Sequence, residues 1–170
     1  MSGYIGLSDV QALPDPQLGY QFNFLVPNVP GQGSGRGLAV RCKSTSIPGQ
    51  EQEVAQVILH GVELDFAGRT TFSHSQTITL LETRDFYSRN TIRQWFDFCR
   101  NIRTKTGNYA AAYKAPAILQ LFDDTNTVTK EIQLIGTWPK TLNDAALSAE
   151  ASTPVEVEVT LSYDLWTDLS

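Results

Sequence analysis

The sequence predicts a mainly β domain, a sandwich or barrel with one α-helix packed on it, and three observations carry this prediction. Several segments alternate apolar and polar residues with the period of two that is typical of half-buried strands. A single segment repeats apolar residues at spacings of three and four, as a helix with one buried face does. With 41% hydrophobic and 18% charged residues, the chain is rich in Thr, Ser, Gln, Asn and Gly instead, which suits strands and turns.

The length of 170 residues predicts one domain, since a domain takes roughly 150 residues. Residues 1–18 contain Pro14 and Pro16 and show little periodicity, so we predict an N-terminal arm that becomes ordered only against a partner. Residues 19–170 then form the single domain, because no internal repeat, linker or change of composition divides them.

Alternation of apolar and polar residues predicts the strands. They cover residues 20–26, 38–43, 51–60, 62–66, 76–81, 117–122, 128–138 and 155–166. The glycine-rich stretch 30–37 is interpreted as the mobile tip of a hairpin that joins the first two strands, and residues 67–70 as a turn. The last strand is the clearest, because apolar residues point one way along it while the carboxylates of Glu156, Glu158 and Asp164 point the other.

One amphipathic helix is predicted in the region that Gly107 ends. The residues of its buried face recur at spacings of three and four and are Ile92, Trp95, Phe96, Cys99 and Ile102. Thr83 or Asp85 can cap this helix by accepting hydrogen bonds from the free amide groups of its first turn. Its length suits a single helix packed across a sheet.

No cofactor or metal site is predicted. The possible zinc ligands Cys42, His60, His74 and Cys99 lie 18, 14 and 25 residues apart, whereas a structural zinc site needs closely spaced pairs of ligands. Both cysteines are expected to be free and buried, as in proteins of a reducing compartment. A distant Cys–His nucleophile pair has no local support.

No enzyme is predicted either. The glycines around Ser34 have the spacing neither of a phosphate loop nor of a nucleophile elbow. The carboxylates of the last strand lack a partner cation or nucleophile, so they are interpreted as a solvated face. Asp123 and Asp124 are interpreted as a turn.

The charge of the chain argues against binding to anionic surfaces. The formal net charge is −5, and only residues 84–105 are locally basic. Because the chain has no overall excess of basic residues, we expect neither a groove that binds nucleic acid nor a polybasic surface that binds membranes. The apolar runs are far shorter than the roughly 18 residues of a membrane span, and residues 1–15 lack the features of a secretory signal. We therefore expect a protein made and folded in a cytoplasm.

Three groups of segments carry a resemblance to a known family. They are residues 22–26 with 40–49, Gly61 with 67–72, and 127–139 with 155–166. The most specific parts are the Cys-Lys-x-Thr-x-Ile-Pro turn from Cys42 and the Lys-Glu-Ile…Gly-x-Trp-Pro strand from Lys130. In this order and at these spacings they resemble the tail tube proteins of contractile-tailed, T-even-like bacteriophages. The helix and the stretch 31–37 match poorly.

The resemblance implies a ring-forming tube fold and a structural role in the virion tail, assembled in the bacterial host cytoplasm. Six copies would form a ring, and rings would stack into a rigid tube. Sheath, tape-measure and baseplate proteins would be its partners, and DNA would pass through the lumen during ejection without sequence-specific binding. An acidic wall suits this role, since a basic wall would hold the polyanion.

Two surfaces are predicted on this basis. The lumen would be lined by polar residues that alternate along 51–66 and 76–82, namely Glu51, Glu53, Gln56, Thr77 and Thr79. Contacts between rings would come from the arm, from the loop 141–153 and from the turn that contains Ser44, Thr45, Ser46, Ile47 and Pro48. The alternatives are a baseplate tube initiator, a tube protein of a secretion system or tailocin, and a monomeric β-sandwich that binds a ligand such as carbohydrate.

Overall fold

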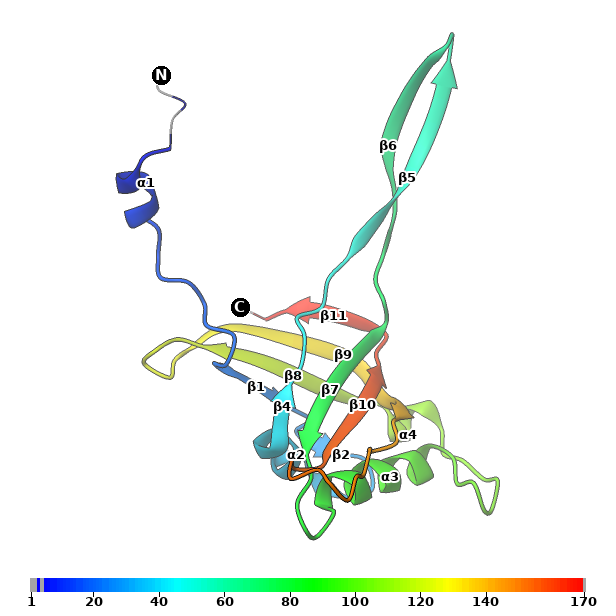
Figure 1. Cartoon of the computed structure of the whole chain (residues 1–170). Coiled ribbons are helices and arrows are strands. Elements are labelled where there is room, and N and C mark those ends of the chain that lie inside the picture. The colour runs from blue at the N-terminus through cyan, green and yellow to red at the C-terminus, as the bar shows by residue number, and fades with distance from the viewer. Residues whose placement is uncertain (1–2, 4, 170) are drawn as a thin grey trace.

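The main sheet of the molecule curls into a nearly closed barrel (Figure 1). The structure is a computed structural model that describes residue 3 and residues 5–169. The strands of its main sheet are, in spatial order, β1 (Phe22–Leu25), β8 (Ala115–Phe122), β9 (Val128–Leu142), β10 (Glu156–Ser162), β7 (Ser75–Leu81) and β4 (Cys42–Ser44), with β11 (Leu165–Asp168) paired to β9. All these pairs are antiparallel. The prediction of a mainly β barrel or sandwich is confirmed.

Strand β9 belongs to both halves of the sheet. Its first part pairs with β8 and β11, and its last part, from Trp138, pairs with β10. The strand turns between the two parts at Gly136, whose φ of +70° lies in the left-handed region. A Cβ atom at this position would lie 2.2 Å from Oδ2 of Asp164, so any side chain here would displace that carboxylate.

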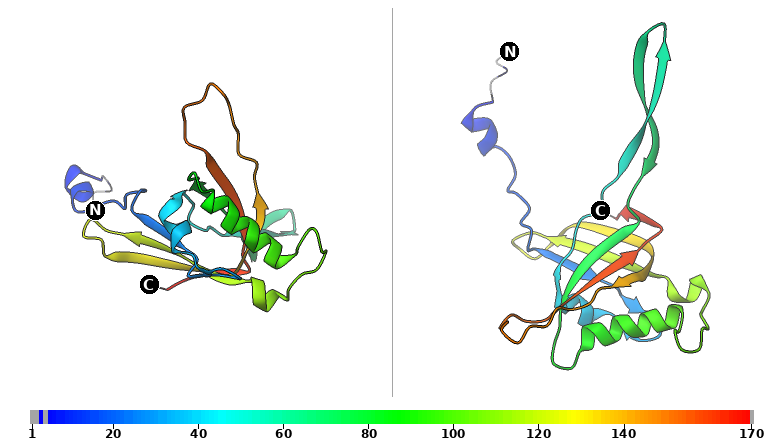
Figure 2. Two further views of the ribbon diagram at one scale, coloured as in Figure 1. Left: turned by 90° about the horizontal axis from the view of Figure 1, so that it is seen from below. Right: turned by 45° about the vertical axis from the view of Figure 1, so that its right-hand side comes forward.

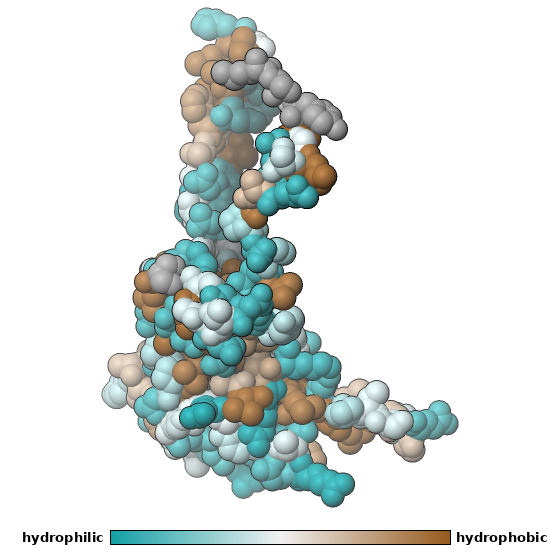
Figure 3. Space-filling model, turned by 90° about the vertical axis from the view of Figure 1, so that its left-hand side faces the viewer, coloured by the Kyte–Doolittle hydropathy of each residue, from teal (hydrophilic) through white to brown (hydrophobic). Residues whose placement is uncertain are grey.

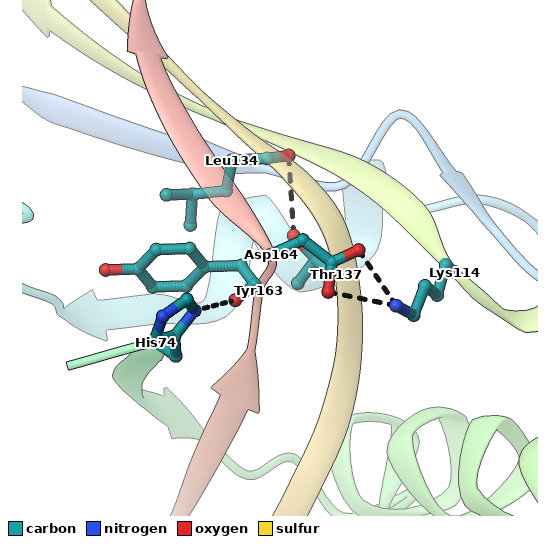
Figure 4. Close-up of polar contacts among 6 residues, drawn as sticks. All are labelled: His74, Lys114, Leu134, Thr137, Tyr163 and Asp164. Atoms are coloured by element: carbon teal, nitrogen blue, oxygen red, sulfur yellow. Dashed lines mark hydrogen bonds and ion pairs between the residues drawn. The ribbon is translucent and has the colours of Figure 1, made fainter. Parts of the chain in front are cut away.

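The prediction of one strand over 155–166 is wrong, because Tyr163 and Asp164 interrupt it and separate β10 from β11 (Figure 4). The carboxylate of Asp164 accepts hydrogen bonds from Nζ of Lys114 at 2.8 and 2.9 Å. Tyr163 donates its backbone N–H to the carbonyl of His74, whose Nδ1 lies 3.1 Å from the carbonyl of Tyr163. These contacts hold a change of direction in the chain. Before it, β10 pairs with β7, and after it, β11 pairs with the first part of β9.

A continuous core fills the barrel and extends to the long helix α3 (Tyr87–Cys99), which lies at its lower end in Figure 1. The inward residues of β7 and β10 are buried as their alternation predicts, among them Ile78, Leu80 and Val159. Trp95 of α3 is fully buried, and its Nε1–H donates a hydrogen bond of 2.9 Å to the carbonyl of Tyr113. Short α4 (Ala110–Tyr113) supplies that carbonyl as it leads the chain back to β8.

The cap of α3 differs from the prediction. Neither Thr83 nor Asp85 caps the helix, which begins at Tyr87 after Phe86 in a left-handed conformation. Glu82 takes that role: its carboxylate accepts hydrogen bonds from the backbone N–H groups of Ser88 and Arg89 at 3.2 and 3.0 Å. The helix also ends at Cys99, so Ile102 lies beyond it and is exposed, contrary to the prediction.

The predicted strand 38–43 is mostly helix. Residues Arg36–Arg41 form α2, and only Cys42–Ser44 are a strand. The backbone of Gly37 lies so near Tyr87 that a Cβ would be 2.5 Å from the phenolic oxygen. The guanidinium of Arg41 stacks over the same ring, 4.3 Å from its centroid. These long-range contacts with α3 outweigh the short alternating pattern that favoured a strand.

The glycine-rich stretch is not the tip of a long hairpin. Two short strands pair here instead, β2 (Asn28–Val29) just before the stretch and β3 (Gly33–Ser34) inside it. Val29 is buried in the core, and Gln32 donates a hydrogen bond of 2.7 Å to the carbonyl of Thr91 in α3. The stretch is therefore held against the domain.

Most of the predicted arm 1–18 lies within the described residues, and residues 1, 2 and 4 lie outside them. Helix α1 (Leu7–Gln11) stands away from the barrel, with no buried residue (Figures 1 and 2). Only the end of the segment touches the domain: Gln17 donates a hydrogen bond of 2.8 Å to the carbonyl of Phe122.

Candidate assembly surfaces

A long hairpin leaves the barrel and projects from it (Figures 1 and 2). Its strands are β5 (Glu51–Leu59) and β6 (Val62–Thr71), and they pair only with each other. His60 and Gly61 form the turn with φ values of 49° and 79°, as a two-residue hairpin loop requires. The predicted turn at 67–70 is wrong, because β6 continues through it with an irregularity in register opposite Gln52 and Val54.

The hairpin has two unlike faces. Residues that pair directly share a face, and the pairs alternate between faces along the ribbon. One face carries the apolar pairs Leu59–Val62, Val57–Leu64 and Ala55–Phe66, and the other carries Ile58–Glu63, Gln56–Asp65 and Val54–Ala67. We call these the apolar face and the acidic face. All twelve side chains are exposed, with Phe66 at 55% and Leu59 at 58%, and hydrophobic surface is visible along the projection in Figure 3.

An exposed apolar face of this kind indicates a partner. A two-stranded hairpin is marginally stable on its own in water. Contiguous apolar surface on a soluble protein marks an interaction site more often than scattered single residues do. Contact with another chain would both stabilise the hairpin and cover its apolar face.

The structure does not bring the five predicted lumen residues together. Glu51, Glu53 and Gln56 lie on the hairpin, where Gln56 is on the acidic face and the two glutamates point to the other side. Glu53 forms an ion pair with Arg69 at 2.9 Å. Which of these three residues faces a lumen stays a prediction.

Thr77 and Thr79 lie instead on the outer face of the barrel. They pair with Thr160 and Glu158 of β10, while their neighbours Gln76, Ile78 and Leu80 point into the core. The result is a polar outer surface rich in threonine and carboxylate. The sequence predicted this polar character, but it grouped the two threonines with the hairpin.

The predicted contact turn, residues Ser44 to Pro48, joins β4 to the base of the hairpin. The side-chain amide of Gln76, a buried residue, donates a hydrogen bond of 2.6 Å to Oγ1 of Thr45 and another to the carbonyl of Ser46. Ile47 remains 60% exposed and lines a groove together with Phe22 and Leu121. This groove lies between β1 and β4, the two strands that leave the barrel open. A role for this turn in ring contacts stays a prediction.

Family membership follows from comparison with known proteins. A model of the phage tail tube protein family matches residues 16–168. The chain belongs to the phage tail tube protein family. It is 29% identical over 135 residues to the tail tube protein of Enterobacteria phage T4, a match that covers 78% of this chain and 82% of the relative. The corresponding protein of phage T6 is 27% identical over the same length and shares of the two chains.

Solved structures share the fold at low sequence identity. A chain in the structure of the anti-feeding prophage cap, which terminates the tube, superposes with a TM-score of 0.68 at 15% identity, over 94% of each chain. A chain of the sheath–tube complex of an extracellular contractile injection system gives 0.66 at 14% identity, over 98% of this chain and 99% of that one. A type six secretion system protein gives 0.55 at 8% identity, over 88% and 82%. The fold is thus that of contractile injection-system tubes.

The prediction of a phage tail tube protein is confirmed, and with it the prediction of a structural protein rather than an enzyme. Within the described residues no group of three or more His, Cys, Asp and Glu side chains could hold a metal ion. None of the helices in that part of the chain is long and apolar enough to cross a membrane.

The cysteines are free and half-buried, and their thiols are held in the neutral form. Burial raises the pKa of Cys42 and of Cys99 from 9.0 to about 11. Because the folded pKa lies above the unfolded one, the stabilisation from the neutral thiols is complete below pH 9. It is lost as the pH rises through 11.

We expect slow alkylation of these thiols in the folded protein. At pH 8 iodoacetamide should react about 100-fold more slowly with the folded chain than with the urea-unfolded chain, because each pKa unit removes tenfold of the thiolate. Mass spectrometry of timed samples measures both rates. Equal alkylation rates in the folded and unfolded chain would contradict the raised pKa of the two thiols.

Proposed function

We propose that the chain forms six-membered rings that stack into a hollow tube, the inner tube of a virion tail. Sheath, tape-measure and baseplate proteins contact the tube, and DNA passes along its lumen without sequence-specific binding. Assembly takes place in the cytoplasm of the bacterial host. Sequence similarity to the tail tube proteins of phages T4 and T6 supports a phage tail over a secretion-system tube.

The exposed apolar face of the hairpin is the observation that carries this proposal. The six apolar residues of this face add nothing to the core of the domain and are unfavourable in water. The hairpin projects from the barrel, so the barrel does not cover the face (Figures 1 and 2). Stacked copies would cover the face. The open edges β1 and β4 support lateral contacts within a ring, because unpaired strand edges tend to pair with other chains.

The outer face of β7 and β10 supports the conduit. Thr77, Thr79, Thr160 and Glu158 give it neutral and negative groups that do not attract a polyanion. This surface is our preferred lumen wall. A density map of the assembled tube tests the choice, since Thr77 and Thr79 must border the channel, and their placement on the outside of the tube would overturn it.

Tube formation tests the role of the hairpin. Val57→Glu puts one charge on the apolar face, whereas Gln56→Glu puts the same charge on the acidic face one residue away. We expect Val57→Glu to reduce the yield of stacked tubes, seen by negative-stain electron microscopy, at least tenfold, and Gln56→Glu to leave it within twofold. Both residues lie outside the core, so circular dichroism should show an unchanged fold. Normal tubes from Val57→Glu would contradict the proposed stacking.

A further inference from the structure

A basic groove runs beside α3 on a protein that is acidic overall. Both arginine and apolar side chains line it. Its lining includes Arg89, Arg93, Phe96, Arg100, Ile102 and Leu142. Arg103 adds a further positive charge, and Asp97 is the one carboxylate among the lining residues. We call this the α3 groove.

The arginines of the α3 groove have no partner within the described part of the chain. Among residues 3 and 5–169, the side chains of Arg89, Arg93 and Arg100 form no hydrogen bond or ion pair, whereas Lys43, Arg69, Lys114 and Lys130 each pair with a carboxylate. Arg93 and Arg100 are exposed. Their charge is therefore available to an acidic ligand, and arginine suits carboxylates because its planar group can bind them through two parallel hydrogen bonds.

The hairpin has the properties that the α3 groove would recognise. Residues 51–71 hold four carboxylates against one arginine. Glu63 and Asp65 occupy the acidic face near the tip, and the apolar face lies directly behind them. A ribbon laid with its apolar face on Phe96, Ile102 and Leu142 would turn its carboxylates outward, within reach of the long arginine side chains that line the groove.

A hairpin cannot enter the groove of its own chain. The two features lie at opposite ends of the molecule, with the hairpin rising from one end of the barrel and α3 lying across the other (Figures 1 and 2). Contact between them must join two copies head to tail. Such a contact uses different surfaces on the two partners, and it generates an open stack when the rotation between successive copies does not close into a ring.

We propose that the α3 groove of one copy holds the β5–β6 hairpin of a second copy in the adjacent ring. The inference rests on the proposed stacking and adds the receiving surface. The occupant is a second copy of this chain because the hairpin matches the groove in both its charge and its apolar face, and because its position at the other end of the domain allows the contact to repeat.

Charge reversal on each side tests the pair. Glu63→Arg with Asp65→Arg reverses the hairpin, and Arg93→Glu with Arg100→Glu reverses the groove. We expect each double variant to lower the yield of tubes at least tenfold while rings still form. The combination of all four substitutions should restore tubes to within threefold of the original protein. All four residues are exposed, so circular dichroism of each variant should match that of the unchanged protein.

A matched control has the same change of charge elsewhere. Arg36→Glu with Lys140→Glu reverses two exposed cations outside the α3 groove and should leave tube formation unchanged. Normal tubes from the groove variant, or no recovery in the combined variant, would overturn the inference. If Val57→Glu prevents tubes while the groove variant forms them, stacking through the hairpin stands, and the α3 groove serves an acidic partner other than this chain.

Discussion

Replacing Trp95 by alanine should cost about 3–5 kcal/mol of folding free energy. The side chain is fully buried between α3 and the barrel, and its indole N–H holds the carbonyl of Tyr113 at 2.9 Å. Alanine leaves a cavity and a carbonyl without its donor. In a chain of this length each kcal/mol lowers the melting temperature by about 2–4 °C, so we expect a fall of roughly 6–20 °C.

Trp95→Phe separates the two contributions. It retains most of the buried volume but removes the hydrogen bond, so the loss should be smaller, about 1–2 kcal/mol. Thermal unfolding followed by circular dichroism, in the Val57→Glu background to limit assembly, measures both variants. If Trp95→Ala unfolded at the same temperature as Trp95→Phe, the cavity argument would fail.

Replacing Gly136 by alanine should cost about 1–3 kcal/mol. The φ of +70° at this turn is unfavourable for any residue with a Cβ atom. The new methyl group would also lie 2.2 Å from Oδ2 of Asp164 and would push that carboxylate away from Lys114. Chemical denaturation gives the loss directly.

A double-mutant cycle distinguishes backbone strain from side-chain collision. In the background of Asp164→Ala the new methyl group meets no carboxylate, so Gly136→Ala should cost less than it does in the unchanged chain. The remaining cost reports the strained φ together with the contact to Cβ of residue 164, which would lie 3.3 Å away. An equal cost in both backgrounds would mean that the carboxylate simply moves aside and that the backbone accounts for the whole effect.

Much of the barrel could be predicted from the sequence because its strands bury alternate residues. The strands 76–81 and 117–122 match β7 and β8 closely, since Ile78, Leu80 and Leu119 face one core. Sequence periodicity reports this directly. The strand 128–138 was also correct, although β9 continues to Leu142 through pairing with β10 that local sequence does not encode.

The errors occur where distant contacts decide the local structure. Residues 36–41 form a helix because Gly37 and Arg41 pack against Tyr87, which lies nearly fifty positions later. Glu82 caps α3 although it lies several residues before the helix. The chain turns at Phe86, which is in the left-handed conformation, and this turn brings the Glu82 carboxylate to the first turn of the helix. The break at Asp164 depends on Lys114 and Gly136. No window of neighbouring residues contains these partners.

The assembly surfaces were only partly accessible to sequence reasoning. The alternation along residues 51–66 was recognised, but its two strands were placed in the barrel wall rather than on a projecting ribbon. Pairing across His60 and Gly61 was the missing signal, since a two-residue turn with Gly at its second position favours a hairpin. Once the strands are paired, Val57 with Leu64 and Gln56 with Asp65 define the two faces.

The continuity of β9 has a mechanical consequence. This strand is hydrogen-bonded in both halves of the sheet, to β8 and β11 at one end and to β10 at the other. A force that pulls the two halves apart must therefore stretch a covalent backbone or shear many hydrogen bonds at once, instead of unzipping them one at a time. Such a load therefore acts on the backbone of β9 itself, which passes through Gly136 from one half of the sheet to the other.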